Sequence, residues 1–236
     1  MERLLSRLVE RLKNAYQDRL VSVILYGSAA AGDHHGRFSD LNVLCVLREI
    51  TPRELADAGA IFRWWREQGH PAPLLMSAEE VRTSTDCFPI EFHDLRERHR
   101  VLYGEDVAAA LEVEECFYRA EVEHELRAKL LRLRQKAAGV LADKELLRGL
   151  LVDSVSTFCV LIRHALRLAG YPAPFEKREV IREARERFSI DVAPLERLLD
   201  LRQGKIKPRE LDPGSVFAAY LRSVEAVIAA VDRLEK

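Results

Sequence analysis

The stretch that decides the fold is VSVILYGSAAAGDHHGRFSDLNVLCVL, residues 21–47. It opens with a short β-rich run that stops at Gly27-Ser28, and it closes with a nearly continuous apolar run from Leu41 to Leu47. The intervening residues 29–39 are mostly small, polar or glycine. This pattern predicts two strands separated by a loop, and the second apolar run predicts burial on both faces of the sheet.

Polar residues at the ends of these two strands point to phosphate chemistry. A strand that ends in Gly27-Ser28 lets the backbone approach a phosphate closely and offers a hydroxyl donor. The next strand begins with Asp40 and Asn42, which share a face because side chains alternate along a strand. Glu91 is expected on a further strand over 88–92 and can join them. Two carboxylates and an amide oxygen beside a phosphate turn form a divalent-metal site for phosphoryl transfer.

Two other phosphate-binding motifs are excluded. Gly27 and Gly32 have the G-x-x-x-x-G spacing of a P-loop, but Asp33 and His34 follow where Lys and Ser or Thr are required. An aspartate at that position would repel a phosphate. The chain also has no G-x-G-x-x-G, so the fingerprint of a dinucleotide-binding fold is absent.

The pattern Tyr26-Gly27-Ser28 … Ser39-Asp40-Leu41-Asn42 resembles the signature of the nucleotidyltransferase superfamily, which has the DNA polymerase beta-like fold and includes the aminoglycoside and minimal nucleotidyltransferases. Members transfer a nucleoside monophosphate from a nucleoside triphosphate, usually to a hydroxyl, with two Mg²⁺ ions. The resemblance covers roughly residues 20–95. It implies that Gly27 and Ser28 hold phosphate and that Asp40 is the first metal ligand.

The same resemblance implies that Glu91 is the third acid or the general base. It further implies Mg²⁺ as cofactor and ATP or another nucleoside triphosphate as substrate. The acceptor is then a small molecule or a protein that the sequence does not identify.

Asn42 departs from the pattern of the superfamily, which has a second carboxylate at this position. An asparagine amide offers a metal one neutral oxygen and no negative charge, so it is a poor bridge between two Mg²⁺ ions about 3.5–4 Å apart. The sequence therefore leaves two functions open. One is nucleotidyl transfer to a small hydroxylated acceptor, with weak or single-site use of Mg²⁺. The other is a catalytically degenerate module that binds nucleotide or a partner protein in a regulatory or antitoxin-like role.

The pattern of periodicities changes near the middle of the chain. Up to Gly104, segments with strand and helix character alternate, and after it only helical periodicity remains. We therefore predict a fold of the α+β kind: a small mixed-sheet, nucleotidyltransferase-like domain over 1–108, followed by an all-α helical bundle over 109–236. The elements expected in the first half are helices over 2–19 and 55–69, a short helix opened by a Ser77-x-x-Glu80 capping box, and further strands over 73–76, 88–92 and 101–103. The helices expected in the second half are 113–138, 144–169, 176–188, 194–203 and 212–234, the last opened by Asp212 as N-cap and Pro213 as first helical residue.

The amino-acid composition limits the kinds of binding partner that can be expected. Hydrophobic residues make up 48% of the 236 residues, and 37 basic residues balance 38 acidic ones, so the net charge of -1 gives no general attraction to nucleic acid or to an anionic membrane. No apolar run approaches 18 residues, the N-terminus lacks the apolar core of a signal peptide, and the four cysteines form no C-x-x-C pair. We expect a cytoplasmic protein without a membrane or nucleic-acid partner, and a homodimer is left open.

Several further residues are candidates for a role. His93 follows Glu91 at i+2, so on a strand the two share a face and a proton relay is conceivable, although a structural role is favoured. Asp86 is an alternative third acid. Arg119 and His124 have the R-x4-H spacing of HEPN ribonucleases, which arises easily by chance.

Other residues are expected to be structural or carry no assigned purpose. Trp65 lies on one helical stripe with Leu55 and is expected in the core. Arg163 and His164 interrupt an apolar helix and need polar partners if they are buried. Lys205 and Lys207 form a small basic loop whose purpose the sequence does not reveal.

Overall fold

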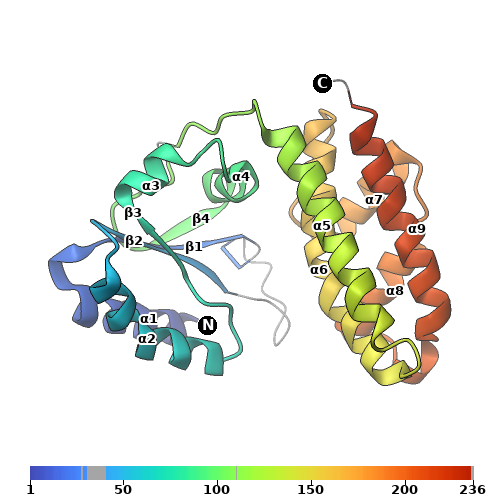
Figure 1. Ribbon diagram of the computed structural model, residues 1–236, viewed down its shortest axis with the longest axis horizontal. Helices are drawn as coiled ribbons and strands as arrows, with labels where there is room; N and C mark the ends of the chain where they lie inside the picture. Colours follow the sequence, from blue (N-terminus) through green and yellow to red (C-terminus); the bar gives the residue numbers. More distant parts are fainter. Residues whose placement is uncertain (28, 31–40, 110, 235–236) are drawn as a thin grey trace. The chain divides into compact units, whose positions relative to one another are not determined.

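The structure is a computed structural model that describes residues 1–27, 29–30, 41–109 and 111–234. It divides into two compact units, Met1–Phe117 and Tyr118–Lys236 (Figure 1). The first unit contains a sheet between helices, and the second is built of helices. The predicted fold class, a small mixed-sheet domain followed by a helical bundle, is confirmed.

The sheet of the first unit is mixed and has the strand order β3-β2-β1-β4. Its strands are β1 (Leu20–Tyr26), β2 (Asn42–Leu47), β3 (Leu74–Ser77) and β4 (His99–Gly104). The central strand β1 pairs antiparallel with both β2 and β4, whereas β2 and β3 are parallel. A parallel pair needs a crossover connection, and helix α2 supplies it.

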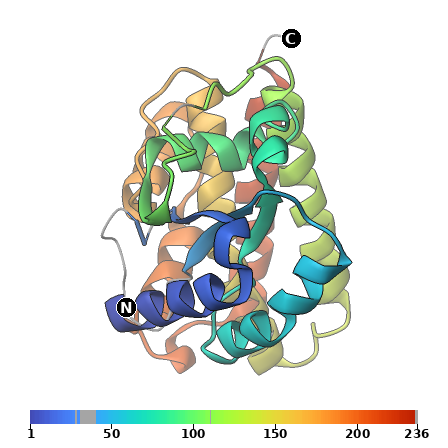
Figure 2. The ribbon, with the colours of Figure 1, turned by 90° about the vertical axis from the view of Figure 1, so that its left-hand side faces the viewer.

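Helices cover both faces of this sheet (Figures 1 and 2). α1 (Glu2–Tyr16), which runs into the 3-10 turn η1 (Gln17–Arg19), and α2 (Pro52–Glu67) pack on one face against Val23 and Leu25. α3 (Ala78–Thr83) and α4 (Pro89–Glu97) belong to the other face, where Ile24 is buried. On β2, Val43 enters the first of these cores and Leu44 the second, which confirms the burial on both faces that was expected for this strand.

Helix α2 shows one correction to the expected core. Trp65 is fully buried, as predicted, but Leu55 is 56% exposed. The buried position in the first turn belongs instead to Glu54, whose carboxylate accepts hydrogen bonds from Arg19 and from Thr51. The capping hydrogen bonds and the ion pair of Glu54 therefore decide which side chain is buried in the first turn of α2, against the apolar pattern of the sequence.

The short helix α3 begins as the sequence predicts. Ser77 Oγ accepts from the Glu80 amide at 3.1 Å, and Glu80 Oε2 accepts from the Ser77 amide at 2.7 Å. This reciprocal pair is a capping box, so two of the amides that a helix start leaves without partners are satisfied.

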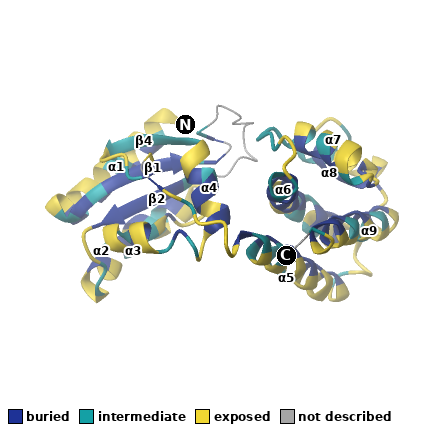
Figure 3. Cartoon of the chain, turned by 90° about the horizontal axis from the view of Figure 1, so that it is seen from above, coloured by how far each residue is buried: buried dark blue, intermediate teal, exposed yellow. Residues whose placement is uncertain are grey.

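The second unit is a bundle arranged around one central helix. Its helices are α5 (Tyr118–Ala138), α6 (Lys144–Leu168), α7 (Lys177–Phe188), α8 (Ala193–Arg202) and α9 (Pro213–Asp232), with the 3-10 turn η3 (Pro208–Glu210) before α9. α6 contacts α5, α7, α8 and α9, and its buried face lies inside the bundle (Figure 3). α5 begins five residues later than the expected range of 113–138.

Helix α9 satisfies the length and composition of a membrane span, alone among the helices in the described part of the chain. In this structure 44% of its most apolar window is buried. Val216, Tyr220, Val227 and Val231 point into the bundle and are at most 5% exposed. The apolar content of α9 is therefore that of a core helix of the bundle.

The polar residues that interrupt α6 form a buried chain of contacts. Tyr118 Oη lies 2.6 Å from His164 Nδ1, and Arg163 Nη2 lies 2.8 Å from His164 Nε2. An arginine can only donate, so His164 Nε2 accepts and Nδ1 carries the proton that it donates to Tyr118. Arg163 also lies 4.1 Å above the ring of Phe175. His164 is therefore held neutral, because burial, with the adjacent Arg163 charge, keeps its pKa well below the usual 6.5.

This chain of contacts predicts an acid-labile bundle. Below pH 6.5 the unfolded chain binds a proton at His164, whereas the folded chain does not. The free energy of unfolding is therefore highest above that pH and decreases as the pH falls. The slope is at most about 1.4 kcal/mol per pH unit. Urea unfolding between pH 7 and pH 5 measures it. The variant His164→Asn cannot titrate at this position. At pH 7 it should be less stable than the wild-type protein, and its free energy of unfolding should depend less on pH. An equal pH dependence in the two proteins would contradict a neutral His164 in the folded state.

Candidate functional site

Gly27 forms the turn that follows the central strand. Its φ of +77° lies in the left-handed region, its amide donates to the Arg98 carbonyl at 3.2 Å, and its own carbonyl accepts from the Ala30 amide at 3.1 Å. A Cβ at this position would lie 3.3 Å from Asn42 Nδ2. The turn therefore needs glycine both for its backbone conformation and for the close approach of Asn42.

Asn42 is the first residue of β2 and is half-buried beside this turn. It pairs across the sheet with Tyr26, the last residue of β1. Leu44, two residues further along β2, enters the core under α3 and α4, so Asn42 lies on the α4 face of the sheet. The structure thus brings Gly27 and Asn42 together, as the sequence predicts.

Glu91 does not lie on a strand. The expected strand over 88–92 is wrong, because these residues enter α4, whose first turn carries Pro89 and Glu91. Proline at the first helical position has its backbone preset for the helix, and a carboxylate in the first turn is favoured by the helix dipole. The alternation of Phe88, Ile90 and Phe92 resembles a strand, yet only Ile90 and Phe92 are buried and Phe88 is 49% exposed.

Glu91 is nevertheless near the end of the central strand. Burial raises the pKa of Tyr26 to about 12, and the negative charge of Glu91 contributes to this rise. Tyr26 is the strand partner of Asn42, and both lie on the sheet face that α4 covers. Gly27 and Asn42 therefore meet at the junction of β1 and β2, and the charge of Glu91 acts on Tyr26 at the same strand end.

The other two predicted site residues, Ser28 and Asp40, lie outside the described residues, as do His34 and His35. Within the ranges that the structure describes, no group of three or more His, Cys, Asp or Glu side chains could hold a metal ion. Among the predicted site residues that the structure describes, Asn42 and Glu91 carry side-chain oxygens, an amide and a carboxylate, of the hard type that Mg²⁺ prefers.

His93 has a structural position. Two residues along a helix correspond to a rotation of about 200°, so His93 and Glu91 point to different sides of α4 and the expected shared face is wrong. His93 is 1% exposed, and its Nε2 lies 3.3 Å from Glu115 Oε1.

Arg119, half-buried, pairs with Glu123 at 3.2 Å and approaches the Val231 carbonyl at 3.4 Å. Arg119, one member of the suggested ribonuclease pair with His124, therefore already has partners within the helical unit.

One polar pair at the same strand end was missed. His99, opposite Tyr26 on β4, has its Nε2 2.9 Å from Asp106 Oδ1. Burial acts to raise the pKa of Asp106, but hydrogen bonds from His99 and from the Ala109 amide outweigh it and lower that pKa. The two residues lie on either side of the turn at Gly104, and seven residues of separation give no sequence signal for such a contact.

A glycine substitution tests the turn. Gly27→Ala should cost about 1–2 kcal/mol of stability, the strain of a left-handed alanine, and should also weaken the binding of Mg-ATP. Gly69→Ala is the matched control, because Gly69 has a φ of +87° but nothing within 4 Å of an added Cβ. Unfolding by urea and calorimetry with Mg-ATP measure both effects. Equal Mg-ATP affinity in the two variants would contradict a role for the Gly27 turn.

Comparison with known proteins shows a likeness in structure. No protein-family model and no curated protein sequence matches the chain. Among solved structures, it is similar to the spectinomycin adenyltransferase AAD(9) from Enterococcus faecialis, which was solved with ATP and spectinomycin. The TM-score is 0.61 at 12% sequence identity, and the match covers 97% of this chain and 98% of the other. At this identity the likeness shows the fold alone: the chain shares with that structure a small mixed-sheet unit followed by a helical one.

Proposed function

We propose that the protein transfers a nucleoside monophosphate from a Mg²⁺-bound nucleoside triphosphate to a hydroxyl of a small-molecule acceptor. The observation that carries the proposal is the Gly27 turn, left-handed and packed against Asn42 where β1 and β2 begin to separate. On a fold similar to that of an ATP-bound adenyltransferase, such a turn lets a phosphate approach the backbone closely without a side chain in the way.

The proposed roles follow from the chemistry of the side chains. Gly27 leaves room for a phosphate to approach the backbone closely, and Ser28 binds the triphosphate through its hydroxyl. Asp40 and Asn42 face the metal with one charged and one neutral oxygen. Glu91 accepts the proton of the acceptor hydroxyl, or serves as the third acid beside the metal. The exposure of Glu91 leaves its carboxylate accessible to a substrate.

The proposed reaction forms one bond to the α-phosphorus and breaks another. The acceptor oxygen forms a bond to the α-phosphorus, the bond from that phosphorus to its bridging oxygen breaks, and pyrophosphate leaves. The hydroxyl proton passes to Glu91. Mg²⁺, when bound, neutralises charge on the triphosphate and orients the attacking oxygen. The side chains present fit one such ion better than two, because Asn42 brings no charge to a bridging position.

Incubation with a nucleoside triphosphate labelled at the α-phosphate tests this function. The acceptor panel starts with spectinomycin, which the similar structure contains, and continues with other aminocyclitols and polyols. We expect label to move to one acceptor class only when Mg²⁺ or Mn²⁺ is present, and Asp40→Ala should abolish the transfer while the protein stays folded. Binding of Mg-ATP without transfer to any acceptor would favour the catalytically degenerate module, and transfer by Asp40→Ala would contradict the role of Asp40.

Asn42→Asp tests the neutral metal position. The added carboxylate should tighten Mn²⁺ binding by about tenfold or more, since a charged ligand replaces a neutral one next to a divalent ion. Asn14→Asp, which adds the same charge on the exposed face of α1, is the control and should leave Mn²⁺ affinity unchanged. Titration calorimetry measures both. Equal affinities in the two variants would show that Asn42 does not face the metal.

Glu91→Gln and Asp86→Asn form a pair that identifies the third acid. We expect the first to lower kcat by about 10²–10⁴-fold, the usual contribution of a positioned acid or base, and the second to leave kcat within about twofold. Asp86 lies in the turn before α4 and is half-buried. The opposite order of effects would move the catalytic role from Glu91 to Asp86.

A further inference from the structure

The helical unit contains a hollow of about 530 Å³ that is lined by basic side chains. Its walls are Glu145 and Arg148 from the first turns of α6 and Lys207, Pro208 and Arg209 from η3. The lining thus contains three cations and one carboxylate. The hollow lies within the unit Tyr118–Lys236, contains none of the residues assigned to nucleotidyl transfer, and includes Lys207 of the basic loop that the sequence left without a purpose.

Arg148 is the unusual member of this set, because it is 9% exposed. Its Nε is buried and has no hydrogen-bond partner among the described residues. Its Nη1 forms an ion pair with Glu145 Oε1 at 2.6 Å, but the Glu145 side chain is 81% exposed, so water screens that charge. Buried donors without acceptors are costly, and in native proteins they are usually matched by a water or an ion.

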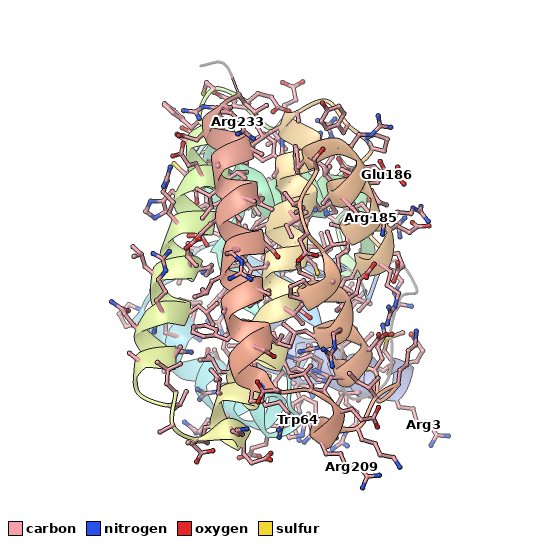
Figure 4. The ribbon with its side chains drawn as sticks, turned by 90° about the vertical axis from the view of Figure 1, so that its right-hand side faces the viewer. Arg3, Trp64, Arg185, Glu186, Arg209 and Arg233 are labelled. Carbon is pink, nitrogen blue, oxygen red and sulfur yellow. The ribbon has the colours of Figure 1, made fainter. Side chains whose placement is uncertain are left out.

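The two other cations are held in place by the backbone of η3. The Lys207 amide donates to Glu210 Oε1 at 3.2 Å, and Arg197 Nη2 donates to the Glu210 carbonyl at 2.7 Å. Pro208 restricts the turn further. Both Lys207 and Arg209 are exposed, and neither forms an ion pair within the part of the chain that the structure describes. Figure 4 shows the side chain of Arg209 extending outward next to the start of α9.

We propose that this hollow binds a small, soluble phosphate-bearing anion. Its lining carries a net charge of +2, which a phosphate monoester with a charge of about −2 near neutral pH balances and a single carboxylate does not. The guanidinium groups of Arg148 and Arg209 suit paired hydrogen bonds to phosphate oxygens, and Lys207 adds a compact positive charge. Glu145, exposed at the rim, turns away into water when the anion takes its place beside Arg148.

Titration calorimetry with inorganic phosphate at constant ionic strength tests the proposal on the full-length protein. We expect Lys207→Gln with Arg209→Gln to weaken phosphate binding by about tenfold or more, because charge-assisted hydrogen bonds are lost. Lys205→Gln removes an equal kind of charge from the same loop but not from the hollow, so it should change the affinity by less than about twofold. Both sets of substitutions are on exposed side chains, so the fold is retained.

A second measurement observes the buried arginine directly. The Nε–H resonance of Arg148 should shift and exchange more slowly with water when phosphate is added to the wild-type protein, and Arg148→Gln identifies the resonance by its loss. No phosphate binding, binding unchanged in the double variant, or an equal loss in Lys205→Gln would each overturn the proposal. Saturable phosphate binding that leaves the Arg148 Nε–H resonance unchanged would overturn the proposal as well.

Discussion

The antiparallel register between β1 and β2 is the constraint on which the site depends. It sets Tyr26 opposite Asn42, places Asn42 against the Gly27 turn, and turns both Asn42 and Tyr26 toward the face that α4 covers. A slip of one residue would move Asn42 under α1 and α2 and send Leu41 or Val43 to the α4 face. In this register the side chains of β1 and β2 are buried in two separate cores, one on each face of the sheet.

The parts of the fold that the sequence predicts are those with strong local signals. The continuous apolar runs before Gly27 and after Asp40 indicate buried central strands, and the Ser77–Glu80 pair indicates a helix start that the structure has. Asp212 and Pro213 open α9 as expected, since the Asp212 side chain accepts from the Ser215 amide. Each of these signals is set by residues a few positions apart, so tertiary contacts are not needed to interpret them.

The errors occur where distant residues decide the outcome. Phe88, Ile90 and Phe92 alternate as in a strand, but Pro89 and the packing of α4 on the sheet favour a helix. Leu55 looks like a core residue, yet the ion pair of Glu54 with Arg19, 35 residues away, takes the buried place. The His99–Asp106 contact and the buried Nε of Arg148 likewise follow from the fold rather than from spacing. Glu91 lies on a helix and not on the expected strand, and its charge acts on Tyr26, the strand partner of Asn42.

The account predicts a single place where phosphate, metal and carboxylate meet: the mouth of the Gly27 turn. The most direct measurement is a crystal structure of the protein with Mn²⁺ and a non-hydrolysable ATP analogue, with the anomalous signal used to locate the metal. We expect triphosphate oxygens at the Gly27 turn and on the Ser28 hydroxyl, and Mn²⁺ beside Asp40 and Asn42, with Glu91 on the same side. A triphosphate bound elsewhere, or a metal that contacts neither Asp40 nor Asn42, would contradict it.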